Sequence, residues 1–134
     1  MASNLFGTFI CCHSVAPHMA AQGFGTIVNI NYGAAVRTGF LNVPSGVSKA
    51  SIDRLPLGLR TELREKGMAC VSLSLPTTDT STTRQIYAGQ DISGWAQAPE
   101  LTARTVRLLL EDGALQYSGQ VLSVRQFLSE KERG

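Results

Sequence analysis

The chain has 134 residues, a net charge of +2 at pH 7 and 43% hydrophobic residues, so we expect one globular domain over residues 1–134. No basic cluster stands out among its 12 Lys and Arg residues, which gives nucleic-acid binding no support. No apolar run of about 18 residues occurs, so no membrane span is predicted. The three cysteines favour reduced thiols, and no basic region precedes the first apolar stretch as in a secretion signal. Both features predict a cytoplasmic protein.

The first predicted element is a helix over Asn4–Met19, where apolar residues recur at spacings of three and four. Pro17 lies inside this pattern, and we expect it to kink or end the helix near its last turn. His13 and His18 are five positions apart and do not share a helix face as i, i+4 metal ligands do. No metal site is therefore predicted.

The next elements are a strand, a loop and a second helix. Thr26–Ile30 is an apolar run typical of a buried strand, and Gly and Asn punctuate the loop predicted over Asn31–Pro44. Helical spacing returns over Ser45–Lys66, and Gly67 is suited to end that helix. Pro56 removes a backbone hydrogen bond in mid-helix at a cost of about 3 kcal/mol, so we expect a kink or a break there.

A second strand is predicted over Met68–Leu75 and is ended by Pro76. The segment Thr77–Gln97 has no clear period, which predicts a long loop. Tyr87 and Trp95 are the residues in this loop that we expect to pack down as anchors.

Pro99 suits the first position of a third helix, and Gly113 is expected to end it. Gly119–Val124 is predicted to be a third strand, and residues 129–134 a polar tail. The buried side of the third helix is expected to comprise Leu101, Val106, Leu109 and Leu110. Helices that alternate with strands predict an α/β fold, with a parallel sheet of about three strands, three main helices and right-handed crossovers.

Several segments resemble, in order and spacing, the second half of short-chain dehydrogenases/reductases. They are NLFGTF with PHM, then GTIVNI, then SGVSKASIDRL with GLRTELREKGMACVSLSLP, and finally SGQVLSV. The resemblance runs from Asn4 to about Val124 and implies part of a doubly wound, Rossmann-like fold. In that family the Gly-rich turn and the residue that selects NAD or NADP lie upstream of these segments. We therefore expect a truncated chain that lacks the N-terminal half and does not bind the family cofactor, NAD(P), alone.

The resemblance also carries the family's catalytic positions onto this chain. The family uses Asn, Ser, Tyr and Lys, where Tyr gives or takes the substrate proton and Lys lowers the pKa of that Tyr. The matching positions are Asn4, Tyr32, Ser45 and Lys49, so Tyr32 stands where the family has Ser, and Ser45 where it has Tyr. A serine hydroxyl titrates far above a phenol, so Ser45 is a poor proton donor at neutral pH. The positions that match cofactor contacts are Lys49, Pro76, Thr77 and Thr80.

Three functions are compatible with this pattern. The first is a family member without NAD(P)-dependent oxidoreductase activity, a pseudoenzyme. The second keeps residual or partner-assisted activity through Tyr32 and Lys49. The third is a non-catalytic interaction module that forms homo- or hetero-oligomers through helices 4–19 and 45–66, since these helices form the dimer interface in the family. A hydrolase that uses Ser45 as nucleophile has less support, because a nucleophile elbow needs a strand directly before the Ser.

Overall fold

The computed structural model describes residues 2–32 and 43–133. The elements in chain order are α1 (Ala2–Gln22), β1 (Gly25–Tyr32), α2 (Val43–Arg64), β2 (Met68–Leu75), α3 (Ser81–Ile86), α4 (Pro99–Glu111), the 3₁₀ helix η2 (Ala114–Tyr117), β3 (Val121–Ser123) and α5 (Val124–Arg133). Within this part of the chain, one parallel sheet has the strand order β1-β2-β3. The predicted parallel α/β architecture is confirmed.

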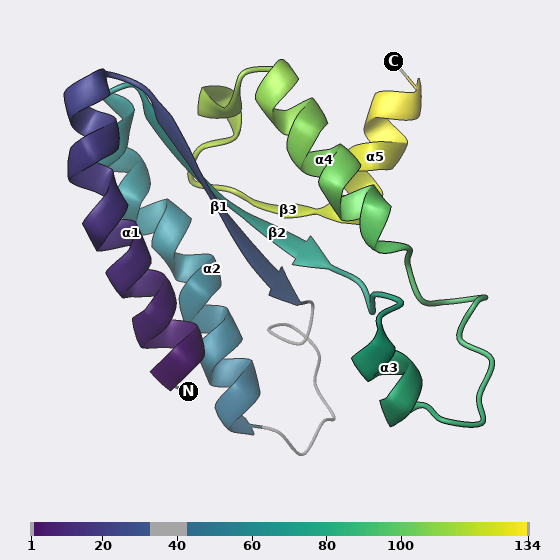
Figure 1. Cartoon of the computed structure of the whole chain (residues 1–134). Coiled ribbons are helices and arrows are strands. Elements are labelled where there is room, and N and C mark those ends of the chain that lie inside the picture. The colour runs from purple at the N-terminus through teal and green to yellow at the C-terminus, as the bar shows by residue number, and fades with distance from the viewer. Residues whose placement is uncertain (1, 33–42, 134) are drawn as a thin grey trace.

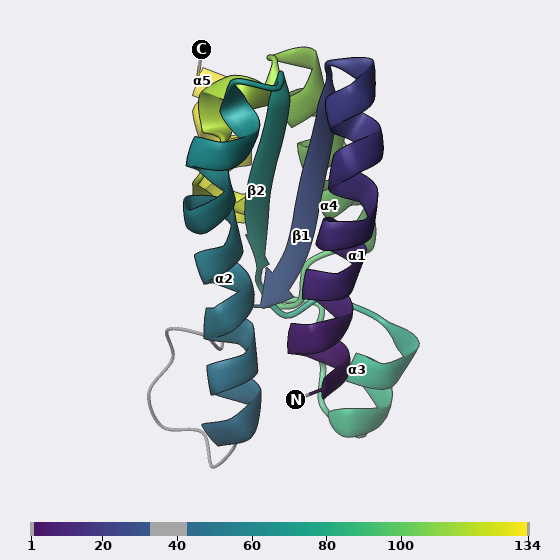
Figure 2. The same ribbon diagram turned by 90° about the vertical axis from the view of Figure 1, so that its left-hand side faces the viewer.

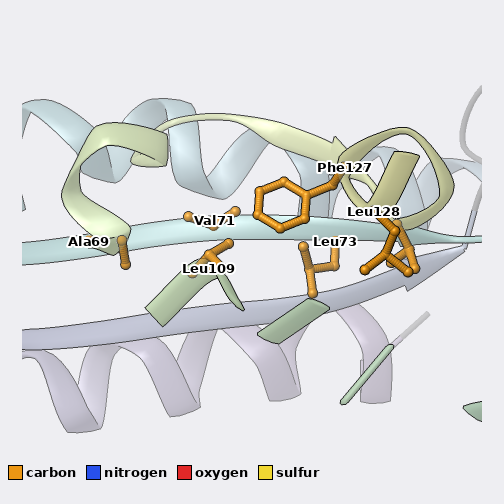
Figure 3. Packing of buried hydrophobic residues seen from close by; sticks show 8 residues of the cluster. Ala69, Val71, Leu73, Leu109, Phe127 and Leu128 are labelled. Carbon is orange, nitrogen blue, oxygen red and sulfur yellow. The ribbon is translucent and has the colours of Figure 1, made fainter. Parts of the chain in front are cut away.

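Helices cover both faces of the sheet: α1 and α2 lie on one face, and α4 and α5 on the other (Figures 1 and 2). The central strand β2 begins with six consecutive buried residues, and alternate ones serve the two layers. The layer of α4 and α5 holds Ala69, Val71, Leu73, Leu109, Ala114, Val124, Phe127 and Leu128 (Figure 3). The layer of α1 and α2 holds Cys12, Ile27, Leu63, Met68 and Cys70. Each large apolar side chain buried in this way contributes about 1.5–3 kcal/mol.

Neither internal proline ends its helix. α2 continues through Pro56, so the predicted break is wrong, because the proline is compensated from outside the helix. Pro56 leaves the Ile52 carbonyl without its usual helical donor. The Ser72 hydroxyl, from the central strand, donates to that carbonyl at 3.4 Å. α1 likewise runs past Pro17 to Gln22, held by packing of its last turns on the sheet.

The segment Thr77–Gln97 is more ordered than its sequence predicts. It contains α3, whose N-cap Thr80 accepts a hydrogen bond from the Thr83 N–H at 3.2 Å. A parallel bridge between Thr78 and Gln97 closes the segment. Tyr87 and Trp95 pack on each other, edge to face with ring centroids 5.0 Å apart, but Trp95 stays 39% exposed and is not a buried anchor. The helix was missed because six residues are too few to show a helical period.

The C-terminal elements also differ from the prediction. The third strand is shorter than predicted, with only Val121–Ser123 paired, and α5 replaces the expected tail up to Arg133. α5 forms because Val124, Phe127 and Leu128 are buried on one of its faces. On α4, Leu110 is half-exposed, unlike the fully buried Leu109.

The loop predicted over Asn31–Pro44 is shorter at both ends. Asn31 and Tyr32 belong to β1, and Pro44 lies in the first turn of α2. The rest of that predicted loop, residues 33–42, lies outside the described residues. Gly67 follows α2 with φ +70°, as expected for a residue that ends a helix, and a Cβ there would lie 2.1 Å from the Gly23 carbonyl oxygen.

Candidate functional site

The candidate site lies at the carboxyl edge of the sheet, where parallel strands end together. Tyr32 is the last residue of β1 and is paired in register with Leu75, the last residue of β2. The phenol oxygen of Tyr32 lies 3.0 Å from the Thr77 hydroxyl oxygen, just after β2. The phenol therefore contacts the first residue of the loop that leaves the neighbouring strand after Pro76.

A second set of contacts holds the first turns of α2 against β1. The Asn31 amide, only 2% exposed, donates from Nδ2 to the Lys49 carbonyl oxygen at 2.8 Å. Asn31 lies on the same face of β1 as Ile27 and Asn29, and α1 and α2 cover this face. The contact therefore joins the strand to the helix. The position of Lys49 is thus set through its backbone.

Ser48 connects the remaining predicted positions. The Asn4 Nδ2 donates to the Ser48 Oγ at 3.4 Å, and the Ser48 hydroxyl donates to the Ser45 carbonyl oxygen at 2.9 Å. Ser45 and Lys49, four positions apart on α2, share a helix face. The structure therefore brings Asn4 to the turn that carries Ser45 and Lys49.

Sequence reasoning missed Asn31 and Ser48, although both are buried polar residues of this site. Asn31 had a detectable signal, since the period of two in the strand places it on the same face as Ile27. Ser48 had none that separates it from the other serines nearby, because its role depends on Asn4, which lies 44 positions earlier.

The positions that match cofactor contacts have local partners. Pro76 follows β2, Thr77 contacts Tyr32, and the Thr80 oxygen caps α3. Among the described residues, the chemistry at this edge is accordingly that of hydroxyl and amide groups, together with the Tyr32 phenol and Lys49. Ser45 supplies an aliphatic alcohol at the position where the family resemblance places a proton-donating phenol.

Two of the three thiols, Cys12 and Cys70, form a separate, buried group between α1 and the sheet. The Cys12 thiol contacts the Asn29 Oδ1 at 3.9 Å, and the Asn29 Nδ2 lies 3.9 Å from the Cys70 sulfur. Burial, aided by the neighbouring Cys12 thiol, raises the pKa of Cys70 to about 12. Burial, with a smaller effect from Cys11, also raises the pKa of Cys12. Both thiols stay protonated at neutral pH, which gives them a packing role and not a nucleophilic one.

No group of three His, Cys, Asp or Glu side chains that fits a metal ion occurs in residues 2–32 and 43–133. None of the helices in these same ranges has the length and apolar character needed to cross a bilayer.

Comparison with known proteins bears on both the fold and the family. The sequence model described as short chain dehydrogenase matches residues 1–91. Dehydrogenase/reductase SDR family member 1 of Mus musculus is 31% identical over 132 residues, which cover 89% of this chain and 42% of the mouse protein. The chain thus spans less than half the length of this curated relative.

Solved structures of related proteins have the same fold. A short chain dehydrogenase/reductase family protein superposes with a TM-score of 0.78 at 29% identity, over 90% of this chain and 52% of that one. The gluconate 5-dehydrogenase of Burkholderia cenocepacia, solved with NADP and tartrate, shares the fold with a TM-score of 0.76 at 24% identity, over 90% of this chain and 51% of its own. The predicted resemblance is confirmed, and the chain belongs to the short-chain dehydrogenase/reductase family.

Proposed function

We propose that this chain is a family member that does not by itself catalyse NAD(P)-dependent hydride transfer. The observation that carries the proposal is Ser45, which stands at the position that matches the family's proton-donating Tyr. General acid–base catalysis contributes about 10²–10⁴-fold to rate, and it requires a donor whose pKa lies near the operating pH. An aliphatic alcohol does not meet that requirement.

The contacts of Tyr32 support the same conclusion. A swap of roles would need Tyr32 to act as the acid together with Lys49. Its phenol instead lies 3.0 Å from the Thr77 hydroxyl, on the side of β2, whereas Lys49 belongs to α2. The hydrogen bond to Thr77 competes with any bond from Tyr32 to a substrate oxygen.

We also propose that NAD(P) is the cofactor of the family fold but is not held by this chain alone. The sequence contains no G-x-G-x-x-G between a strand and a helix. The groove of about 580 Å³ under α1 is lined by none of the predicted site residues. NADP is bound by the B. cenocepacia relative, which is about twice as long as the part that matches.

The test is consumption of NADPH and NADH with a panel of ketones and aldehydes, followed by absorbance. Wild type, Tyr32→Phe and Lys49→Met are expected to match the protein-free blank. Tyr87→Phe, which removes a phenol that packs on Trp95, is the matched control. Turnover by wild type would contradict the proposal. If Tyr32→Phe and Lys49→Met abolish that turnover while Tyr87→Phe keeps it, residual catalysis by this chain through Tyr32 and Lys49 replaces the proposal.

A role in association is favoured by a separate observation. Large apolar side chains are half-exposed or more on the outer sides of α1 and α2, namely Phe6, Phe9, Val47 and Leu57. Exposed apolar patches mark interaction surfaces. We propose that helices 4–19 and 45–66 mediate a homo- or hetero-oligomer through these side chains.

Light scattering on a sizing column tests the homo-oligomer directly. The wild-type chain is expected to be a dimer at tens of micromolar, and Phe9→Glu or Leu57→Glu to be a monomer. Leu115→Glu, a similar change at an exposed residue of η2, should leave the dimer intact. A wild-type monomer at that concentration would count against self-association.

A further inference from the structure

The segment Thr77–Gln97 is a closed unit at the carboxyl edge of the sheet. Two backbone hydrogen bonds of 2.8 Å join its ends, one from the Gln97 N–H to the Thr77 carbonyl and one from the Asp79 N–H to the Gln97 carbonyl. Within it, the Arg84 guanidinium donates two hydrogen bonds to the Asp79 carboxylate, at 2.6 and 2.9 Å. Because all of these contacts lie inside the segment, they keep its shape but do not fix its position on the protein.

Arg125 contacts this unit from the C-terminal helix. Its Nη2 donates a hydrogen bond of 2.8 Å to the Trp95 carbonyl oxygen, near the end of the segment. Arg125 is the second residue of α5, and its neighbour Val124 is fully buried, so the backbone that carries the guanidinium is anchored in the core. The Trp95 side chain, in contrast, is 39% exposed. The hydrogen bond thus ties an exposed part of the segment to a fixed point.

The chemistry of the two groups suits a persistent contact. An arginine side chain is always charged in proteins, and it presents five N–H donors in a planar arrangement. A hydrogen bond with one charged partner is stronger than a bond between two neutral groups. The acceptor is a backbone carbonyl, which is present whatever side chain position 95 carries. The contact therefore depends on the side chain of Arg125 alone.

This contact is linked to the candidate site. Trp95 lies two positions before Gln97, the residue that is bonded to the Thr77 backbone. The Thr77 hydroxyl lies 3.0 Å from the Tyr32 phenol oxygen at the end of β1. Figures 1 and 2 show α3 beyond the carboxyl ends of β1 and β2, whereas α5 lies on one face of the sheet. A change in the position of the segment at Trp95 therefore reaches Tyr32 through the bonded ends of the segment.

We propose that α5 acts as a strap on the segment Thr77–Gln97, and that Arg125 is the positioning residue of this strap. With the bond from Arg125 to Trp95 in place, the segment is held at the carboxyl edge and the Thr77 hydroxyl stays on the Tyr32 phenol. Release of the bond frees the segment and lengthens the contact between Thr77 and Tyr32, while the buried face of α5 stays packed. Ligands of open α/β sheets bind at this edge, so the strap sets how accessible the edge is.

Arg125→Met is the variant that releases the strap. Methionine keeps an unbranched side chain at this exposed position but has no donor for the Trp95 carbonyl. The matched control is Arg104→Met, which removes an arginine that contacts Glu132 of α5 at 3.2 Å and leaves the Arg125 contact in place. Arg125→Lys tests rescue, because it restores a charged donor on a long side chain.

The fluorescence of Trp95 is the first measurement. Trp95 is the only tryptophan of the chain, so its emission reports on the segment without a label. Acrylamide should quench Trp95 more strongly in Arg125→Met than in wild type, because the freed segment exposes the indole. Quenching in Arg104→Met should equal that of wild type, and Arg125→Lys should fall between wild type and Arg125→Met.

A second measurement separates a strap from a purely structural role of Arg125. The chain has three tyrosines, so labelling with fluorotyrosine gives three fluorine resonances, which the Phe variant of each tyrosine assigns. In Arg125→Met the Tyr32 resonance should shift, because its Thr77 partner moves. The Tyr117 resonance should stay, since that ring packs on Phe127 of α5, with centroids 5.5 Å apart, and α5 keeps its place.

Any of four results would overturn the proposal. Arg125→Met gives wild-type quenching of Trp95 or a wild-type Tyr32 resonance; Arg104→Met changes both as much as Arg125→Met does; or Tyr117 shifts while Tyr32 does not, which would show that Arg125 acts on the core. The fourth is loss of the helical circular-dichroism signal in Arg125→Met, because folding does not require an exposed strap residue.

Discussion

The side of the molecule built from β2, α4 and α5 differs from the side built from α1 and β1 in how it meets solvent. On the first side, eight buried apolar residues close a core around β2, and ion pairs such as Lys131–Asp112 and Arg104–Glu132 lie at its surface. On the second side, α1 and β1 carry no charged residue and leave Phe6, Phe9 and Ile30 in solvent. Surface ion pairs add little stability, so the charges mark a water-facing surface. The uncharged side has instead the character of a contact surface.

Shortening a side chain in the β2 core should therefore lower the free energy of unfolding much more than shortening one on the exposed side of β1. Leu73→Ala removes a fully buried side chain from the β2 core and should lower the free energy of unfolding by about 2–5 kcal/mol. Ile30→Ala, at the half-exposed edge of β1, should cost no more than about 1 kcal/mol. Urea unfolding followed by circular dichroism measures both. Equal losses in the free energy of unfolding would mean that Ile30 is packed as tightly as Leu73.

A double-mutant cycle tests how α2 is joined to the central strand. Ser72→Ala should cost about 1 kcal/mol in the wild-type chain, because the Ile52 carbonyl then loses its donor. In a Pro56→Ala background the restored backbone N–H serves that carbonyl, and the same change should cost close to nothing. Additive losses in the cycle would show that the Ser72 hydroxyl does not compensate for the proline.

The smallest expected effect concerns acid stability on the charged side. Hydrogen bonds from Lys131 and then Tyr117 hold the pKa of Asp112 below its usual value. A carboxyl whose pKa is lower in the folded state stabilises the fold above its unfolded pKa of about 3.9, and this contribution fades as pH falls through the folded pKa. Asp112→Asn should thus lower the melting temperature at pH 7 and have less effect at pH 3. A difference that grows toward pH 3 would contradict the ion pair.

Elements with a strong local pattern were predictable from sequence. The limits of β2 follow from a mainly apolar run, interrupted by Ser72 and Ser74, and from Pro76. The start of α4 follows from Pro99, which occupies its first turn. The prediction missed α3 because this capped helix has only six residues. It missed α5 because that helix buries only Val124, Phe127 and Leu128 within a polar stretch. Of the kink or break expected at Pro56, the break does not occur, and the reason is not local, since the compensating Ser72 lies on another element.

The candidate site was likewise predictable in part. The four matched positions could be named from the resemblance to the family, and two of their immediate contacts are backbone atoms that any residue would supply. The Lys49 carbonyl accepts from Asn31, and the Ser45 carbonyl accepts from Ser48. The direction of the Tyr32 phenol toward Thr77 depends on the register of β1 with β2, which no local pattern encodes.

The most direct test of the central claim, that this family member does not by itself run NAD(P)-dependent chemistry, is a fluorescence titration of the purified chain with NADPH and with NADH. We predict no saturable change up to millimolar cofactor, for wild type and for Lys49→Met alike. Saturable micromolar binding by wild type that Lys49→Met weakens would contradict this account and return the carboxyl edge of the sheet to a catalytic role.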